Sequence, residues 1–233
     1  QKEIKELIAK QVDGIVYVTT HERVLKCFPK ELNVPAVMAY GYTRSPKYPS
    51  IVVDDRKGAA EVIRYLFSMG HRRIGIVSGP VRSLHTRERL LGVQDIFTEQ
   101  GISFEKKCVV EGDWRRGSGY RGTDSLLEQK VTAIFCMSDI MAGGVYDRLG
   151  ELGLIPGKDI SVAGFDDREL STYYKPPLTT TALPLFEIGY TACEHAIRKI
   201  EGSDCGEVPE ELLEIARSCS LTVRDSVKDI RIQ

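Results

Sequence analysis

The sequence predicts an α/β fold in which parallel strands are covered by helices on both faces of the sheet. Segments with helical spacing of apolar residues alternate along the whole chain with short apolar runs rich in β-branched residues. Strands that are separated by helices in this order form parallel sheets. The chain has 233 residues, of which 42% are hydrophobic, so it can bury the core of one large domain or of two smaller lobes.

Most of the expected helices have apolar residues at intervals of three and four, and most end at a glycine. Val62, Ile63 and Leu66, for example, share one face of a helix that ends near Gly70. We expect helices, in chain order, at residues 2–11, 23–32, 56–70, 87–100, 117–128, 139–152 and 184–201.

The expected strands are the short apolar runs between these helices. The run at 12–18 is rich in valine and isoleucine, which is typical of a parallel strand that is buried on both faces. We expect strands, in chain order, at residues 12–18, 34–38, 51–53, 74–77, 109–110, 133–136 and 160–165.

Composition and charge exclude several classes of protein. The net charge of −1 argues against tight nucleic-acid binding by this chain alone, because such binding needs an excess of Lys and Arg. No apolar run approaches the roughly 18 residues that span a bilayer, and no signal peptide is visible at Gln1. The six cysteines form no C-x-x-C pair, so we expect reduced, mostly buried thiols in a cytosolic protein, without zinc or a disulfide framework.

The motifs of common catalytic sites do not occur in the sequence. It contains no G-x-S-x-G, no G-x-x-x-x-G-K-[ST] and no H-E-x-x-H, and its four histidines lie far apart. We therefore expect no catalytic residue, metal or cofactor. His71 is expected on a surface turn between a helix and a strand.

Polar residues follow the predicted strands, and ligands bind beyond the carboxyl ends of parallel strands. Asp166 stands directly after the strand at 160–165, where it either accepts hydrogen bonds from a ligand or caps a helix; for Asp167 we favour the cap. Arg89 lies at the start of a predicted helix, and its guanidinium suits polyols, carboxylates or phosphates, unless it is a solvated surface residue.

Two further strand ends carry candidate residues. Trp114, the only tryptophan, is either part of the core or a wall on which a ring compound stacks. Ser138 precedes the helix at 139–152, which indicates an N-cap first and a ligand contact second.

Longer motifs point to a known family. The most specific is 139–145, followed by Gly-Leu-Ile-Pro-Gly-Lys-Asp-Ile-Ser-Val-Ala-Gly-Phe-Asp-Asp at 153–167 and then by 176–180. Together with 12–15, 53–59, 70–74 and 89–92, these stretches resemble the effector-binding core of the lactose/galactose-repressor (LacI/GalR) family of bacterial transcription regulators. The resemblance covers nearly the whole chain, and 211–218 looks like the closing strand of the family.

The resemblance implies a periplasmic-binding-protein-like fold. Two α/β lobes, joined by three crossovers near 52–54, 180–183 and 215–217, would hold a small molecule between them. One lobe would comprise 1–53 and 184–214, and the other 54–183 and 215–233. The family's core normally begins with a strand–helix–strand unit that this chain lacks, so we expect the first lobe to be incomplete and the chain to be part of a longer protein.

The resemblance also assigns the effector contacts. The arginine of the family's R-x-x-G motif falls on Arg89, the aspartate after a glycine–aromatic pair on Asp166, and the aromatic residue after Gly-Asp on Trp114. Tyr40 stands where the family often has an aspartate, which alters one polar arm of the site. The remaining expected contacts are Ser138, His85, Ser83, Tyr40 and Thr19.

The function implied is that of a cytoplasmic repressor whose sugar-like effector controls operator binding through an N-terminal helix-turn-helix outside this chain. The family also implies a homodimer formed by the helices that begin at Met141 and Arg168 (141–152 and 168–174), so that a charge at Tyr146 or Leu149 would weaken association. The alternatives are the solute-binding protein of a sugar transport system and an enzyme that uses Asp166 and His85 as an acid–base pair.

Overall fold

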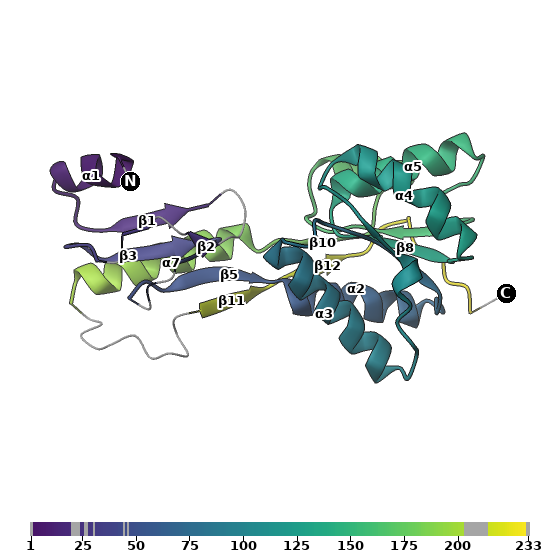
Figure 1. The fold of residues 1–233 in the computed structure, drawn as a ribbon, viewed down its shortest axis with the longest axis horizontal. Coiled ribbons are helices and arrows are strands. Elements are labelled where there is room, and N and C mark those ends of the chain that lie inside the picture. Colours follow the sequence, from purple (N-terminus) through teal and green to yellow (C-terminus); the bar gives the residue numbers. More distant parts are fainter. Residues whose placement is uncertain are drawn as a thin grey trace. The chain divides into compact units, whose positions relative to one another are not determined.

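A computed structural model describes residues 2–19, 24–25, 28–29, 31–43, 45, 47–202 and 214–231. The chain divides into two compact units. Unit 1 comprises Gln1–Asp54 and Pro184–Arg217, and unit 2 comprises Asp55–Leu183 and Ser218–Gln233, so the chain passes between them three times. Both units contain parallel sheets flanked by helices, which confirms the predicted fold class (Figure 1).

Unit 1 is built on a four-stranded sheet. Its strand order is β1 (Ile15–Val18), β3 (Ala36–Ala39), β5 (Ser50–Asp54) and β11 (Glu214–Ser218). β1 and β5 both pair in parallel with β3. Helix α7 (Leu185–Ile200) packs against β1, β3 and β5, and α1 (Lys2–Ala9) contributes Ile4 to a cluster with Ile15 and Met38.

The helix expected at 23–32 is wrong for its described residues. Val24–Leu25 form strand β2, which pairs in parallel with β4 (Tyr42–Thr43). Pro29 gives a physical reason, because a proline inside a helix removes a hydrogen bond and clashes with the preceding turn. Residues 23, 26, 27 and 30 lie outside the described part of the chain.

Unit 2 contains the second sheet and most of the helices. Its strand order is β7 (Val109–Glu111), β6 (Ile74–Ser78), β8 (Ala133–Cys136) and β9 (Ser161–Ala163), and all neighbours are parallel. Figure 1 shows α4 (Arg116–Glu128) and α5 (Asp139–Glu151) on one side of this sheet, and α2 (Asp55–Ser68) and α3 (Leu84–Glu99) on the other. The remaining elements are η1 (Lys106–Cys108), α6 (Leu170–Tyr173) and the antiparallel pair β10 (Thr180–Ala182) and β12 (Ser220–Thr222).

Three expectations about single side chains are wrong. His71 lies between α2 and β6 but is buried, where its Nε2 donates to the Lys228 carbonyl and its Nδ1 accepts from Thr132. Leu149 is fully buried and Tyr146 is only 9% exposed, with its hydroxyl donating to the Pro176 carbonyl. These two side chains belong to the core of unit 2, so a charge at either position would disrupt packing within the chain.

Glycines allow α4 and α5 to pack closely. A Cβ atom at Gly119 of α4 would lie 1.9 Å from the Met141 carbonyl oxygen, and one at Gly144 of α5 would lie 1.9 Å from the Arg116 carbonyl oxygen. Neither backbone oxygen can give way without moving its helix. The contact between these helices therefore requires glycine on both sides.

We expect Gly119→Ala and Gly144→Ala each to lower the free energy of unfolding by roughly 1–3 kcal/mol, because the added methyl group forces the helices apart. Gly150→Ala on the same helix is the control, since a Cβ there meets nothing within 4 Å. It should leave stability unchanged or raise it by up to about 1 kcal/mol, because alanine favours helix. Urea unfolding curves of the three variants test this; equal effects at positions 144 and 150 would contradict it.

Candidate functional site

The carboxyl ends of three neighbouring strands bring the candidate residues of unit 2 together. Gly79 follows β6, Ser138 lies just after β8, and Asp166 lies just after β9. Helix α3 begins soon after β6 and carries Arg89 in its second turn. Residues far apart in the sequence thus meet at one edge of the sheet.

Arg89 is held in place by a carboxylate that the sequence analysis did not select. Its Nε donates to Asp55 Oδ1 at 2.6 Å, and its Nη1 donates to the Met137 carbonyl. Both side chains of the ion pair are almost completely buried. Asp55, the first residue of α2, also accepts a hydrogen bond from Nδ1 of His85 on α3. One carboxylate therefore fixes two of the expected effector contacts.

The guanidinium of Arg89 also brings Asp166 and two aromatic rings together. Asp166 Oδ1 lies 3.8 Å from Nη1 of Arg89. The centroid of the Phe165 ring lies 3.7 Å from the guanidinium carbon and that of Trp114 lies 5.8 Å from it. Arg89, Asp166 and Trp114 are thus neighbours within unit 2, and Arg89 is not a solvated surface residue.

Trp114 is half-buried and adopts a left-handed backbone conformation, with φ of 65°. Its ring lies directly over Gly79, where a Cβ atom would come within 2.1 Å of it. Gly79 is therefore required for the ring to reach this place.

Asp166 and Asp167 have different partners. Burial raises the pKa of the Asp166 carboxyl, while Arg89 and Arg168 oppose this shift. The predicted capping role of Asp167 is wrong: α6 begins after Glu169, and Asp167 instead accepts a hydrogen bond from Arg224 at 2.7 Å. Arg224 supplies a charge partner, which stabilises a carboxylate more than a free helix end does.

The other expected contacts of unit 2 lie at helix starts. Ser138 is the N-cap of α5 and accepts a hydrogen bond from the Met141 amide, as predicted. Ser83 is the N-cap residue of α3, but its side chain makes no capping hydrogen bond. His85 pairs with Asp55, so the acid–base pair of His85 with Asp166 is not the arrangement found.

Thr19 and Tyr40 belong to unit 1. Thr19 is buried and donates from Oγ1 to the Tyr40 carbonyl oxygen. Tyr40 follows β3 with φ of 62°, and its amide donates to the Ile51 carbonyl. The two residues are thus in contact with each other, at the carboxyl ends of β1 and β3.

Asp139 is a second buried carboxyl that the sequence analysis did not assign to the site. It accepts hydrogen bonds from Thr180 Oγ1 at 2.6 Å and from the Arg168 amide at 2.8 Å. Burial is the main cause that raises its pKa to about 7, and the negative charges of Asp166 and Asp167 add to the shift. Asp139 therefore joins α5 to β10 and to the loop that carries Asp166.

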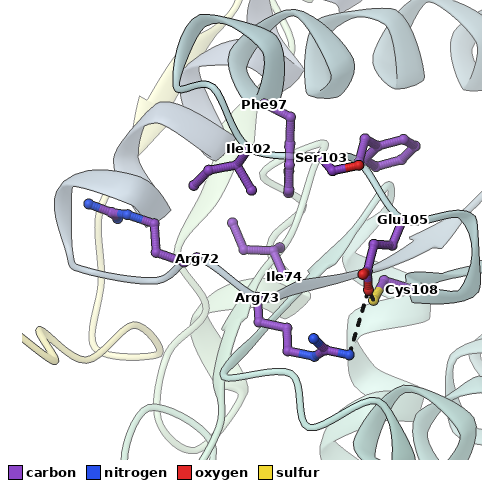
Figure 2. Close-up of a pocket in the computed structure, with 9 residues that line it drawn as sticks. Arg72, Arg73, Ile74, Phe97, Ile102, Ser103, Glu105 and Cys108 are labelled. Carbon is purple, nitrogen blue, oxygen red and sulfur yellow. Dashed lines mark hydrogen bonds and ion pairs between the residues drawn. The ribbon is translucent and has the colours of Figure 1, made fainter.

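A separate cavity in unit 2 contains none of the expected site residues. It has a volume of about 320 Å³ and lies beside Ile74, the first residue of β6, at the opposite end of the strand from Gly79. Figure 2 shows Arg73 at its rim, paired with Glu105 at 3.6 Å, and apolar side chains from Ile74, Phe97 and Ile102. The cavity is thus distinct from the candidate site.

Metal-binding clusters and membrane-spanning helices are absent from the part of the chain that the structure describes. No cluster of three or more His, Cys, Asp or Glu side chains within it can hold a metal ion. Its helices are all too short or too polar to cross a membrane. Of its cysteines, Cys108, Cys136 and Cys219 are buried and Cys193 is exposed, and none of these four forms a disulfide.

Asp139 makes stability depend on pH. Its pKa is raised in the folded chain, so the fold favours the protonated carboxyl, and the parent should lose stability relative to Asp139→Asn as pH rises from about 4 to about 7. The slope is at most about 1.4 kcal/mol per pH unit. Chemical unfolding at several pH values measures it. Asp95→Asn is the control. Arg56 lowers the pKa of Asp95, so the stability difference between Asp95→Asn and the parent should not change with pH in this range. If the difference between Asp139→Asn and the parent is equally independent of pH, the raised pKa of Asp139 is wrong.

Comparison with known proteins agrees with this geometry. A model of the periplasmic binding protein-like domain matches residues 63–227. The chain is 30% identical over 225 residues to the HTH-type transcriptional repressor CytR of Escherichia coli K12, covering 95% of this chain and 64% of that protein. The chain thus spans less than two thirds of that relative.

Solved structures give the same result. A LacI-family transcriptional regulator from Rhizobium etli is 27% identical, with a TM-score of 0.83 and coverage of 97% of this chain and 82% of that chain. The lac repressor dimer bound to operator and the anti-inducer ONPF is also 27% identical, with a TM-score of 0.76 and coverage of 97% and 77%. The resemblance to the effector-binding core of LacI-type regulators is thereby confirmed, and the chain belongs to the periplasmic binding protein-like domain family.

Proposed function

We propose that this chain is the effector-sensing core of a LacI-type transcriptional repressor, which binds a sugar or sugar derivative and thereby controls operator binding. The observation that carries the proposal is the meeting of Arg89, Asp166 and Trp114 at the strand ends of unit 2. A charged donor, a charged acceptor and an aromatic face together suit a hydroxyl-bearing ring.

In this proposal Arg89 and Asp166 bind hydroxyl groups and Trp114 packs against an apolar face of the ligand. Ser138, Ser83 and His85 complete the contacts from unit 2; Thr19 and Tyr40 remain predictions from the sequence. Asp55 positions two of these side chains, because its carboxylate accepts hydrogen bonds from both Arg89 and His85.

The proposed partners follow from the relatives. The repressor from Escherichia coli is named for a helix-turn-helix, and the lac repressor structure is a dimer on its operator. We propose that this chain likewise acts in a cytoplasmic homodimer that contacts operator DNA through a helix-turn-helix N-terminal to Gln1. Ligand binding needs to shift operator affinity by only about 1–3 kcal/mol to change it roughly 5–150-fold.

The two alternative functions have less support. A solute-binding protein of a transport system shares the fold, but the relatives at 27–30% identity described above are transcription regulators. An enzyme needs a completed catalytic constellation, and His85 is committed to Asp55 rather than to Asp166.

A thermal-shift screen with sugars, sugar phosphates and nucleobases tests ligand binding. A ligand at 100 times its dissociation constant should stabilise the chain by about 2.7 kcal/mol. Asp166→Ala and Arg89→Ala should abolish the shift, because each removes a proposed hydroxyl partner. Asp95→Ala, which removes an exposed aspartate paired with Arg56, should respond like the parent; an undiminished response of both site variants would disprove the placement.

The proposed dimer surface is tested at exposed positions of the same two segments. Tyr173 of α6 is 69% exposed and Leu152 after α5 is 43% exposed. We expect Tyr173→Asp and Leu152→Asp to weaken self-association, because a charge is costly in an interface core. Analytical ultracentrifugation measures this, with Val81→Asp, at a 63% exposed position between β6 and α3, as the control. A dimer that withstands both changes would argue against this interface.

A further inference from the structure

We propose that the cavity of about 320 Å³ at the amino-terminal end of β6 is a second ligand site of unit 2, and that it takes a small aromatic carboxylic acid. This site does not depend on the proposed function, because it shares no residue with the candidate site beyond the carboxyl end of the same strand. Its apolar lining, its size and the charges at its rim support the assignment.

The lining of the cavity is apolar and firmly packed. Ile74 and Phe97 are only 2% and 4% exposed, and Figure 2 shows Ile102 beside them. The Phe97 ring meets the rings of Phe67 and Phe104 edge-on, with centroids 5.2 Å and 5.4 Å away. These neighbours hold the wall in place before a ligand arrives, so an apolar ring can pack against it at little cost in side-chain entropy.

The size of the cavity limits the ligand. Its volume is near the lower limit of ligand pockets, which span roughly 300–1,000 Å³. Its walls come from the start of β6, the carboxyl-terminal end of α3, the turn at 102–105 and Cys108 of η1. The volume therefore favours a compound with a single ring and a short side chain.

At the rim of the cavity, two cations face a single carboxylate. Glu105 Oε2 lies 3.6 Å from Nη2 of Arg73 and 3.3 Å from Nζ of Lys107. Arg73 is held there because its Nε donates to the Gln129 carbonyl. Within the described residues, neither Nη atom of Arg73 makes a hydrogen bond, since its contact with Glu105 is longer than one. The guanidinium can therefore donate to the carboxylate of a ligand, which matches its geometry.

The remaining ionisable groups of the lining do not offset this positive charge. Nη1 of Arg72 donates to the carbonyls of Phe67 and His71 at 2.7 Å and 3.0 Å, and Figure 2 shows this side chain directed away from Glu105. Burial raises the pKa of the Cys108 thiol, so the thiol is neutral at physiological pH. An anion at the rim thus meets a net positive charge, whereas a cation would be repelled.

The rim is partly exposed to solvent, which limits what its charges contribute. The side chains of Arg73 and Glu105 are 43% and 42% exposed, and that of Lys107 is 55% exposed. Exposed charge pairs contribute little free energy and are screened by salt. We therefore expect apolar burial to supply most of the affinity, and the rim to supply a preference for an acid over its amide.

Titrations with matched probes, followed by amide NMR of the whole chain, test the site. Phenylacetate and phenylpropionate are each compared with the corresponding amide, and phenethylamine is the cationic probe. We expect the acids to shift the amide signals of Ile102, Glu105 and Cys108 in a saturable way, while those of Gly79 and Asp166 stay unchanged. Each acid should bind about threefold or more tightly than its amide at low salt, and the two affinities should converge at about 1 M salt, where the screening length is about 3 Å.

Substitutions at the rim should change this preference in opposite directions. Arg73→Gln should bring the ratio of acid to amide affinity to about one, and Glu105→Gln should raise it about threefold. A merely structural role of Arg73 would weaken both probes alike. Arg64→Gln, which removes a 54% exposed arginine paired with Glu99 at 3.2 Å in the same unit, is the control and should keep the parent ratio. Lys107→Gln, which should also lower the ratio, serves if Arg73→Gln fails to fold.

Filling the cavity tests its place directly. Ile102→Phe puts a larger side chain into the space and should abolish binding of every probe, whereas Ile155→Phe, at a 48% exposed position outside the lining, should bind like the parent. Melting temperatures show that both variants fold.

Four results would overturn the assignment. The first is that neither acid gives a saturable shift at Glu105 and Cys108 up to about 10 mM. The second is that the amides or the amine bind as tightly as the acids, and the third is that Ile102→Phe binds like the parent. The fourth is that the shifts are confined to Gly79 and Asp166, which would move the acid to the candidate site. Each of these results leaves the proposed function standing, because the effector screen tests that function separately.

Discussion

The buried ion pair between Asp55 and Arg89 determines the arrangement of unit 2 around its candidate site. It joins the first residue of α2 to the second turn of α3, with both side chains at most 2% exposed. Removing one partner of such a pair typically costs about 3–5 kcal/mol, because the other charge stays buried without compensation. The start of each helix is thereby fixed relative to the strand ends, and the guanidinium lies beside Met137 and Asp166, which follow β8 and β9.

A second buried carboxyl organises the loop on the other side of that guanidinium. Asp139 accepts hydrogen bonds from Thr180 Oγ1 on β10 and from the Arg168 amide. Arg168 directly follows Asp166 and Asp167, which both have positive φ. Residues in this backbone region are strained unless their surroundings hold them. The Asp166 amide donates to the Thr181 carbonyl, so β10 holds this loop directly through Thr181 and indirectly through the bond from Thr180 to Asp139. The carboxylate of Asp166 owes its position to these contacts.

Much of this could be predicted from the sequence, because the carboxyl ends of parallel strands meet at one edge. That rule selected Asp166, Trp114 and Ser138. Asp55 also follows a strand, β5, but the sequence analysis did not select it. Its role is to hold Arg89, 34 residues later in the chain, and no local sequence pattern encodes such a contact. Helix α5 illustrates a different limit. Its apolar residues, including Leu149, are buried in the core of unit 2. Periodicity alone does not show whether an apolar helix face packs against the same chain or against a second subunit.

The same contacts that hold the fold together also fix the side chains of the proposed binding site. Arg89 is fixed by Asp55, Met137 and the Phe165 ring before any ligand arrives, so ordering this side chain adds little to the free-energy cost of binding. A rigid set of buried donors and acceptors also rejects analogues that lack a hydroxyl group, because its own polar atoms would lose their partners. In the proposed site, a guanidinium that is fixed in this way would select ligands by hydrogen-bond geometry. The stability of unit 2 and the selectivity proposed for its site therefore depend on the same feature, the buried ion pair of Arg89 with Asp55.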